Sequence, residues 1–257
     1  MGLRPLISLA TLTLLSLSLH IQGTEAQMTS SSRPSTLAGR STVYAPNGVV
    51  ATSQPLATGA ALRVLQEGGN AFDAAITAAA VLNVVEPHMT GMGGDVFALF
   101  WSAREGRLRG LDASGRSASL ATPDTILALG LDDVPYRGAG AITVPGALSG
   151  WAALLKEYGT LTLGEALQPA IEIALGGFPV TPIISGQWRG TEEILARDPG
   201  ATATFLIDGK RGPQAGEWFR NPDLAESFSL IAREGTEALY GAIQDLHGRS
   251  EEMYLKK

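Results

Sequence analysis

The most regular pattern of hydrophobic and polar positions lies between residues 68 and 101. Small or apolar side chains fill nearly every position over 71–85, which predicts a helix that has no solvent-facing side and is buried inside a domain. Asn70 is suited to cap this helix, and Asp73, three positions later, completes a pair typical of a capping box. We expect the helix to end before Pro87, because the residue that precedes a proline is disfavoured in a helix.

A glycine loop and an apolar strand follow this helix. Residues 90–94 include three glycines, which permit left-handed dihedral angles or a close approach of two backbone segments. The apolar run over 96–101 has the length of a strand and predicts one that is covered on both faces. With a turn at 104–106 and a second strand over 108–112, the pattern predicts an antiparallel hairpin.

The rest of the chain is predicted to be mainly helical, from the spacing of apolar residues and from start and stop signals. Before the glycine loop we expect a strand at 48–53 and a helix at 55–67. After the hairpin we expect a helix introduced by residues 144–146 and ended by Gly159, a short helix capped by Thr162, and a new helix starting at Pro169. The remaining predicted helices are one at 181–197, one opened at Asn221 and closed by Gly235, and a last one at 237–247. Residues 123–136 have no pattern that assigns them to an element.

The first 26 residues have the features of a secretory signal peptide. Arg4 provides a basic start, an apolar run follows over 6–19, and Thr24-Glu25-Ala26 offers small residues at the positions read by a signal peptidase. The run is shorter than the about 20 residues needed to span a bilayer, and an uncleaved anchor is the alternative. Residues 27–40 are rich in Ser, Thr, Pro and Gly and predict a flexible leader. We therefore expect the mature protein, which has no membrane segment, to be secreted or periplasmic.

Composition and charge narrow the function classes. Of the 257 residues, 45% are hydrophobic and 17% are charged, so the chain can form a sizeable core. A net charge of −6 argues against partners such as nucleic acid or an anionic membrane. The chain contains no cysteine, which excludes disulfides, thiolate metal sites and a cysteine nucleophile. Its three histidines lack metal-ligand spacing, so we expect no metal site and no cofactor.

No complete catalytic set can be assembled from spacing alone. Arg116 is the sharpest candidate, because it lies in a small-residue loop after the expected hairpin, where a guanidinium can bind a carboxylate through two hydrogen bonds. Spacing alone favours the alternative, an ordinary surface arginine. His88 has two interpretations, an acid–base group or a hydrogen-bonded structural residue. Asp95 also has two, a ligand contact or a cap of the glycine loop. Ser149 lacks the spacing of a nucleophile elbow, so we expect it to pack within a helix.

Several short segments occur in one order along residues 48–242: Gly68-Gly-Asn-Ala-Phe-Asp73, Val85-Glu-Pro-His88, Gly91-Met-Gly-Gly94, the Arg116 loop, Val144-Pro-Gly146, Pro169-Ala-Ile171 and Ala238-Leu-Tyr-Gly241. In this combination they resemble the γ-glutamyltransferases, or glutathione hydrolases, a family of N-terminal nucleophile hydrolases. The resemblance implies an α+β fold, the αββα four-layer sandwich of two β-sheets between helical layers, with one sheet incomplete in this chain. It also assigns residues 41–257 to the N-terminal, large-subunit part of such a domain.

The resemblance further implies an enzyme that is made as one precursor and cuts itself into two chains. The N-terminal threonine of the small chain would attack a γ-glutamyl amide, such as that of glutathione, and form an acyl-enzyme resolved by water or an amino acid. Its α-amine would act as the base, and backbone N–H groups would stabilise the oxyanion. Arg116 matches the arginine that pairs with the substrate α-carboxylate in the family. No position here matches the nucleophile threonine, so we expect this chain alone to be inactive and to need a C-terminal, small-subunit part.

Two departures from the family pattern concern the substrate. Ser-Gly-Arg116-Ser-Ala replaces a loop with acidic and apolar neighbours, and Gly94-Asp95 replaces a longer glycine run. Both resemble a divergent branch of the family, so an acyl substrate other than glutathione is an alternative. A second hypothesis is a non-catalytic secreted protein that keeps the arginine pocket to bind γ-glutamyl or acyl-amino-acid groups. A third, a periplasmic solute-binding protein, would require two α/β lobes that the pattern does not show.

Overall fold

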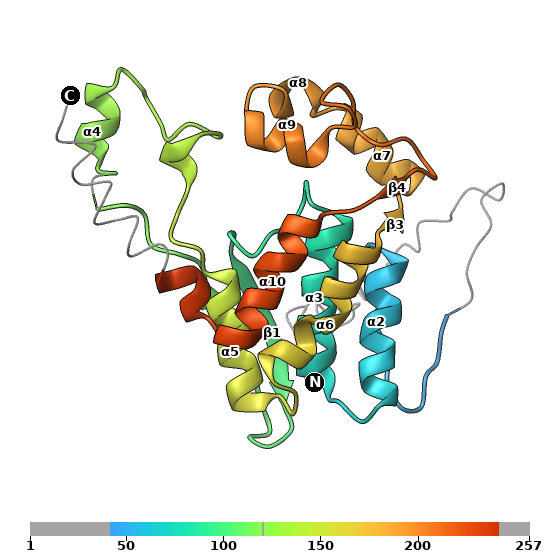
Figure 1. The fold of residues 1–257 in the computed structure, drawn as a ribbon. Helices are drawn as coiled ribbons and strands as arrows, with labels where there is room; N and C mark the ends of the chain where they lie inside the picture. The colour runs from blue at the N-terminus through green and yellow to red at the C-terminus, as the bar shows by residue number, and fades with distance from the viewer. Residues whose placement is uncertain (1–41, 120, 242–257) are drawn as a thin grey trace, which may run out of the picture. The chain divides into compact units, whose positions relative to one another are not determined.

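The computed structural model describes residues 42–119 and 121–241, which are the coloured parts of Figure 1. The chain divides into two compact units, Met1–Pro46 and Asn47–Lys257. In the first unit only residues 42–46 are described, and they form no helix or strand. The predicted signal peptide (1–26) and the whole of the predicted leader (27–40) lie outside the described residues.

The second unit combines helices with two small antiparallel sheets, which agrees with the predicted α+β class. Its elements are α2 (Pro55–Gln66), α3 (Ala71–Val85), β1 (Val96–Ser102), β2 (Arg107–Ala113), α4 (Pro123–Ala128), the 3₁₀ turn η1 (Ala139–Ala141), α5 (Ala147–Tyr158), α6 (Leu163–Gly176), β3 (Phe178–Pro179), α7 (Pro182–Arg189), α8 (Glu192–Leu195), α9 (Pro199–Phe205), β4 (Trp218–Phe219) and α10 (Pro222–Glu234). The last described residues, 237–241, are helical.

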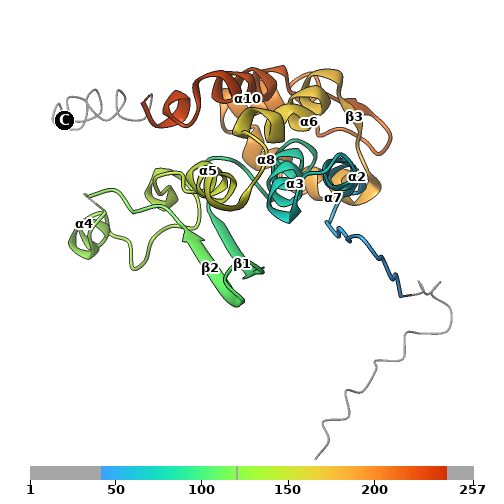
Figure 2. The same ribbon diagram turned by 90° about the horizontal axis from the view of Figure 1, so that it is seen from below.

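Helix α3 is the centre of the core. It packs against α2, α5 and α6, and α10 covers α6, as Figures 1 and 2 show. Its many alanines permit this close packing, because a small side chain keeps neighbouring helices near one another. The predicted capping box is confirmed: the Asn70 side chain accepts hydrogen bonds from the backbone of Phe72 and Asp73, and the Asp73 carboxylate accepts one from the backbone N–H of Asn70.

The prediction that α3 has no solvent-facing side is wrong for one stripe of the helix. Ala71 and Ala75 are exposed and form part of a groove of about 400 Å³. The other wall of the groove comes from residues 49–52 and Leu65. Residues 48–52 are not a strand in the structure, although a strand was expected at 48–53, because no described strand pairs with them.

Strands β1 and β2 form the predicted hairpin, with Val96 opposite Ala113 and Ser102 opposite Arg107. One face packs inward, where the Phe100 ring lies 5.0 Å from the rings of Phe72 and Tyr158. The expectation that both faces are covered is wrong. On the other face large side chains are exposed, to 69% at Phe97, 75% at Leu99, 62% at Trp101 and 58% at Leu108. A continuous apolar run in the sequence therefore fits both a strand that is buried on two faces and a strand that has one exposed apolar face.

Proline 169 lies inside α6 and does not start a new helix, contrary to the prediction. Proline lacks one backbone donor and usually breaks a helix interior. Here the buried face formed by Ala166, Ala170 and Ala174 continues across Pro169, and α6 packs on both α3 and α10. Tertiary packing therefore outweighs the local cost of the proline.

Two other predicted elements differ in the structure. The helix expected at 181–197 is divided into α7 and α8, because Gly190 ends α7 and the Thr191 hydroxyl donates to the Trp188 carbonyl at 2.8 Å. The unassigned stretch 123–136 contains α4, which is capped by the Thr122 side chain. No side chain of α4 is buried, so its sequence carries no amphipathic pattern that could have predicted it.

Candidate substrate-binding site

Three loops meet around Arg116, just beyond the end of β2. The carbonyl of Gly94, before β1, accepts hydrogen bonds from the backbone N–H groups of Gly146 and Ala147 at 2.9 and 2.8 Å. The backbone N–H of Val144 donates to the Arg116 carbonyl at 2.9 Å. The glycine loop, the Arg116 loop and the start of α5 are therefore tied together through their main chains.

The glycines in this region are required by close approach between backbones. A Cβ atom at Gly115 would overlap the carbonyl of Val144, and one at Gly146 would overlap the carbonyl of Ala113. Gly150, one turn into α5, faces the hairpin, where an added Cβ would overlap the Val96 side chain. Any larger residue at these positions would push the loops apart, so the geometry of the Arg116 loop depends on them.

Arg116 is exposed, and its guanidinium makes no hydrogen bond or ion pair with any other described residue. Its neighbours in the loop are fixed by two carboxylates. Asp95 Oδ1 accepts from the Gly115 N–H at 3.1 Å, and Asp112 Oδ1 accepts from the Ser114 N–H at 2.9 Å and from its hydroxyl at 2.7 Å. The loop is thus held by its backbone, while the Arg116 side chain stays available for an external carboxylate.

Asp95 and Asp112 both accept hydrogen bonds from the backbone of the loop that follows β2. Asp95 does not cap its own glycine loop but binds the backbone of the loop after β2. Asp112 lies within β2 and holds the loop that follows it. The hydrogen bonds from the Ser114 hydroxyl and backbone N–H hold the pKa of the Asp112 carboxyl below its usual range, so it remains an acceptor at neutral pH.

Tyr240 supports the start of α5 from a distant part of the sequence. Its hydroxyl donates to the Pro145 carbonyl at 2.7 Å and accepts from the Ser149 N–H at 3.1 Å. The N-cap residue Gly146 offers no side-chain cap, so the tyrosine satisfies one of the unpaired N–H groups of the first turn. The Ala238–Gly241 motif contains this tyrosine, but its partners, 91 and 95 residues away, could not be identified from sequence.

Ser149 lies in helix α5, as predicted, but it is exposed and not packed. Its hydroxyl donates to the Gly146 carbonyl at 2.7 Å, which is the usual local bond of a serine in a first helical turn. The residues 90–94 are also structural, because the Gly94 N–H donates to Gly91 and the Thr90 hydroxyl accepts from the Asn83 side chain. Neither segment offers an activated nucleophile.

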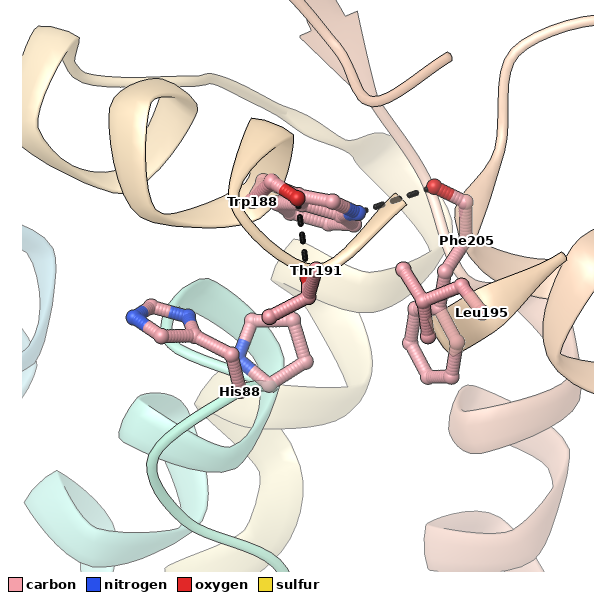
Figure 3. Close-up of a pocket in the computed structure, with 6 residues that line it drawn as sticks. His88, Trp188, Thr191, Leu195 and Phe205 are labelled. Atoms are coloured by element: carbon pink, nitrogen blue, oxygen red, sulfur yellow. Dashed lines mark hydrogen bonds between the residues drawn. The ribbon is translucent and has the colours of Figure 1, made fainter. Parts of the chain in front are cut away.

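His88 lies in a small apolar hollow of about 50 Å³ that Figure 3 shows, and not in the Arg116 loops. The hollow is lined by Pro87, His88, Trp188, Thr191, Leu195 and Phe205. His88 Nε2 lies 2.7 Å from Oε1 of Gln187, and the Trp188 indole donates to the Phe205 carbonyl at 2.9 Å. Substrate pockets usually enclose several hundred Å³. The geometry therefore supports the structural interpretation of His88.

No metal-binding set is found in the described part of the chain, where acidic and histidine side chains form no group of three with suitable geometry. Within residues 42–119 and 121–241, no helix is long and apolar enough to cross a membrane. The arrangement around Arg116 can bind a carboxylate, but the described residues supply no nucleophile and base to act on what is bound there.

The chain is similar to known proteins of one family. The gamma-glutamyltranspeptidase family model matches residues 57–244. The chain is 43% identical over 196 residues to the glutathione hydrolase-like YwrD proenzyme of Bacillus subtilis, with 75% of this chain and 36% of the relative covered. The chain thus spans little more than a third of that relative's length.

Two solved structures share the fold. Cephalosporin acylase from Bacillus halodurans superimposes with a TM-score of 0.75 and 40% identity, with 83% of this chain and 40% of that chain covered. The γ-glutamyltranspeptidase of Helicobacter pylori superimposes with a TM-score of 0.73 and 30% identity, with 78% of this chain and 58% of that chain covered. These matches confirm the predicted N-terminal nucleophile hydrolase fold and the large-subunit assignment.

Proposed function

Because the chain belongs to the γ-glutamyltranspeptidase family of hydrolases and transferases, we propose that it forms the acyl-binding side of an enzyme that cleaves γ-glutamyl or related amide bonds. The observation that carries this proposal is the exposed guanidinium of Arg116, which has no partner among the described residues and lies on a loop whose backbone is fixed on both sides. A rigid loop presents the guanidinium without a large loss of entropy on binding, which favours bidentate recognition of a carboxylate.

In the proposed reaction, Arg116 binds the carboxylate at the far end of the acyl group and so places the amide carbonyl beside the nucleophile. The nucleophile is an N-terminal threonine in a C-terminal part of the protein. Its oxygen forms an ester with the acyl carbon, its proton passes through the α-amine to the leaving amine, and water or an amino acid then releases the acyl group. The arginine contributes positioning and takes no part in the bond exchange.

The acyl group is the point on which two candidates differ. A γ-glutamyl group carries an α-amine beside its carboxylate, whereas a glutaryl-type group carries the carboxylate alone. This chain is 43% identical to a glutathione hydrolase-like proenzyme and 40% identical to a cephalosporin acylase, so acylase activity is a second candidate. Arg116 serves both, because each acyl group ends in a carboxylate.

We propose that the C-terminal, small-subunit part packs on the exposed face of β1 and β2. This outer face is formed by Phe97, Leu99, Trp101 and Leu108. An apolar surface of this kind is unusual on a free monomer and marks an interaction site. Burial of apolar area contributes about 25 cal/mol per Å², so this face can supply a large part of the association energy. In the sandwich of this family two β-sheets lie between helical layers, so one face of this hairpin is expected to lie against further sheet structure.

The proposal also covers the cleavage of the precursor and the location of the mature protein. The predicted signal peptide places the mature protein outside the cytoplasm, and the relative from Bacillus subtilis is named a proenzyme. We therefore propose a secreted or periplasmic precursor that matures by cleavage. The 257-residue chain by itself is expected to show no hydrolysis, because its described residues contain no nucleophile set.

The test joins this chain to the C-terminal part of the Bacillus halodurans acylase and assays γ-glutamyl-p-nitroanilide and glutaryl-p-nitroanilide. The fusion should hydrolyse at least one of them. Arg116→Ala should raise KM about 100-fold, Arg116→Lys should recover part of this loss, and the matched surface variant Arg137→Ala should have no effect. An Arg116→Ala enzyme with unchanged KM would show that the carboxylate binds elsewhere.

A further inference from the structure

We infer that Asp95 is a positioning residue for Arg116, an inference that rests on the proposed role of Arg116 in carboxylate binding. Asp95 Oδ1 accepts a hydrogen bond from the N–H of Gly115, at 3.1 Å and 20 residues away in sequence. The carbonyl of the following residue, Arg116, accepts from the backbone N–H of Val144 at 2.9 Å. The backbone is therefore held on both sides of the Arg116 Cα, on one side by the Asp95 side chain and on the other by the Val144 backbone.

Asp95 can serve as an anchor because its own backbone is fixed. It directly follows Gly94, whose carbonyl accepts two hydrogen bonds from the first residues of α5, Gly146 and Ala147. It also directly precedes β1, which is paired along its full length with β2. The carboxylate thus connects the Arg116 loop to the start of α5 through a short and rigid path.

The positioning role of Asp95 requires a hydrogen-bond acceptor atom in its side chain and not a negative charge. A carboxylate near the guanidinium would by itself oppose the approach of an anionic substrate. Asp95 instead directs one oxygen to a backbone N–H, a bond that an asparagine oxygen can also accept. Replacement of Asp95 by asparagine should therefore preserve the loop, whereas replacement by alanine should release it.

Limited trypsin digestion of the full chain measures the release directly. Trypsin cleaves after Arg116 and also after Arg137, which lies in the same exposed segment and serves as the internal reference. Asp95→Ala should raise the ratio of the initial cleavage rates at Arg116 and Arg137 about threefold or more, because local opening exposes the bond. Asp95→Asn should leave this ratio within about twofold of the wild-type value.

The control is Asp133→Ala, which removes another exposed carboxylate that accepts a backbone N–H, that of Val134 at 2.7 Å. It should not raise cleavage at Arg116. An unchanged ratio in Asp95→Ala, or an equal rise in Asp95→Asn, would overturn the inference. In the first case the hydrogen bond would not restrain the loop, and in the second the charge would be what matters.

A second variant covers the case in which Asp95→Ala disturbs the fold. Asp95→Gly also removes the acceptor, and hydrogen exchange is then compared between the Gly115 amide and the amides of α5. Faster exchange at Gly115 alone supports the inference, whereas an equal rise at both places indicates general loosening and contradicts it.

The joined enzyme separates this inference from the proposed function. If the wild-type fusion is active, Asp95→Ala should raise KM with little change in kcat, and Asp95→Asn should restore the wild-type KM. A fall in kcat alone would contradict a positioning role. An inactive wild-type fusion would count against the proposed function, while the cleavage ratio would still decide the role of Asp95.

Discussion

The carboxylate of Asp73, in the first turn of α3, accepts two hydrogen bonds from Thr160, which lies 87 residues later between α5 and α6. The backbone N–H and the hydroxyl of Thr160 donate at 2.8 and 2.7 Å. Leu161 N–H adds a third bond at 3.0 Å, and Asn70 N–H a fourth at 2.8 Å. One buried side chain therefore caps the central helix and fixes the connection between two others.

This relationship predicts a strong effect of Asp73→Asn on stability. The amide keeps one acceptor oxygen but loses charge and part of the acceptor capacity, which should lower the free energy of unfolding by about 2 kcal/mol. Urea unfolding of wild type and variant measures the difference. Asp124→Asn, at the exposed first turn of α4, is the matched control and should have almost no effect. Equal effects of the two changes would show that Asp73 acts only as a helix-end charge.

The same carboxylate predicts a pH dependence. Burial raises the pKa of Asp73, but the hydrogen bonds from Asn70, Leu161 and Thr160 outweigh it and hold the pKa below the ordinary value of 3.8. The folded form therefore binds this proton less readily than the unfolded form. Its contribution to stability is complete above pH 3.8 and is lost as the pH falls through the lower pKa of the folded state. The difference between wild type and Asp73→Asn should shrink below that pH, and a difference that stays constant would contradict the assignment.

Tyr240→Phe should loosen the start of α5. The change removes a hydroxyl that joins the Pro145 carbonyl to the Ser149 N–H and keeps the ring. We expect a loss of about 1–2 kcal/mol in urea unfolding. The control is Tyr136→Phe, since Tyr136 is 91% exposed. If both tyrosines tolerate the change equally, the bridge has no energetic role.

Gly150→Ala and Gly186→Ala should have opposite signs. Both glycines lie in helices, but a Cβ at Gly150 would overlap Val96 and come within 2.7 Å of the Ala113 Cβ, whereas nothing lies within 4 Å at Gly186. We expect Gly150→Ala to cost about 1–3 kcal/mol by overpacking and Gly186→Ala to stabilise by about 0.5–1 kcal/mol. Thermal unfolding of the two variants is the measurement, and stabilisation by Gly150→Ala would disprove the close contact.

Lysine substitutions on the outer face of the hairpin test the proposed partner surface. Leu99→Lys and Trp101→Lys should reduce self-association of the isolated chain and weaken its binding to a separately produced small-subunit part by at least about tenfold. Val134→Lys, at another exposed apolar position, is the control. Analytical ultracentrifugation and titration calorimetry give the two readouts. Unchanged binding in the hairpin variants would place the partner elsewhere.

The sequence predicted those features of the fold that depend only on residues a few positions apart. The capping pair Asn70–Asp73 and the cap at Thr162 lie where the sequence indicated, because each is completed within four residues. The inclusion of Pro169 in α6 could not be predicted in this way, since it depends on packing against α3 and α10.

In the candidate site, too, features set by nearby residues could be predicted and features set by tertiary contacts could not. Its small-residue loop after the hairpin makes Arg116 the sharpest candidate in the sequence, and the resemblance to a family implies its role. Two of the groups that hold this loop come from residues 20 and 28 positions away, Asp95 before β1 and Val144 before α5. No periodicity or short motif encodes such pairs. They arise only when the hairpin and α5 come together.

The hairpin of β1 and β2 is a sheet of only two strands in the described part of the chain. Each strand therefore keeps one edge at which backbone N–H and C=O groups have no strand opposite them. A strand that joins this sheet must add at one of these edges, and the alternation of inward and outward side chains permits only registers that keep the apolar face continuous. The hairpin thus acts as a template that fixes the alignment of whatever completes the sheet.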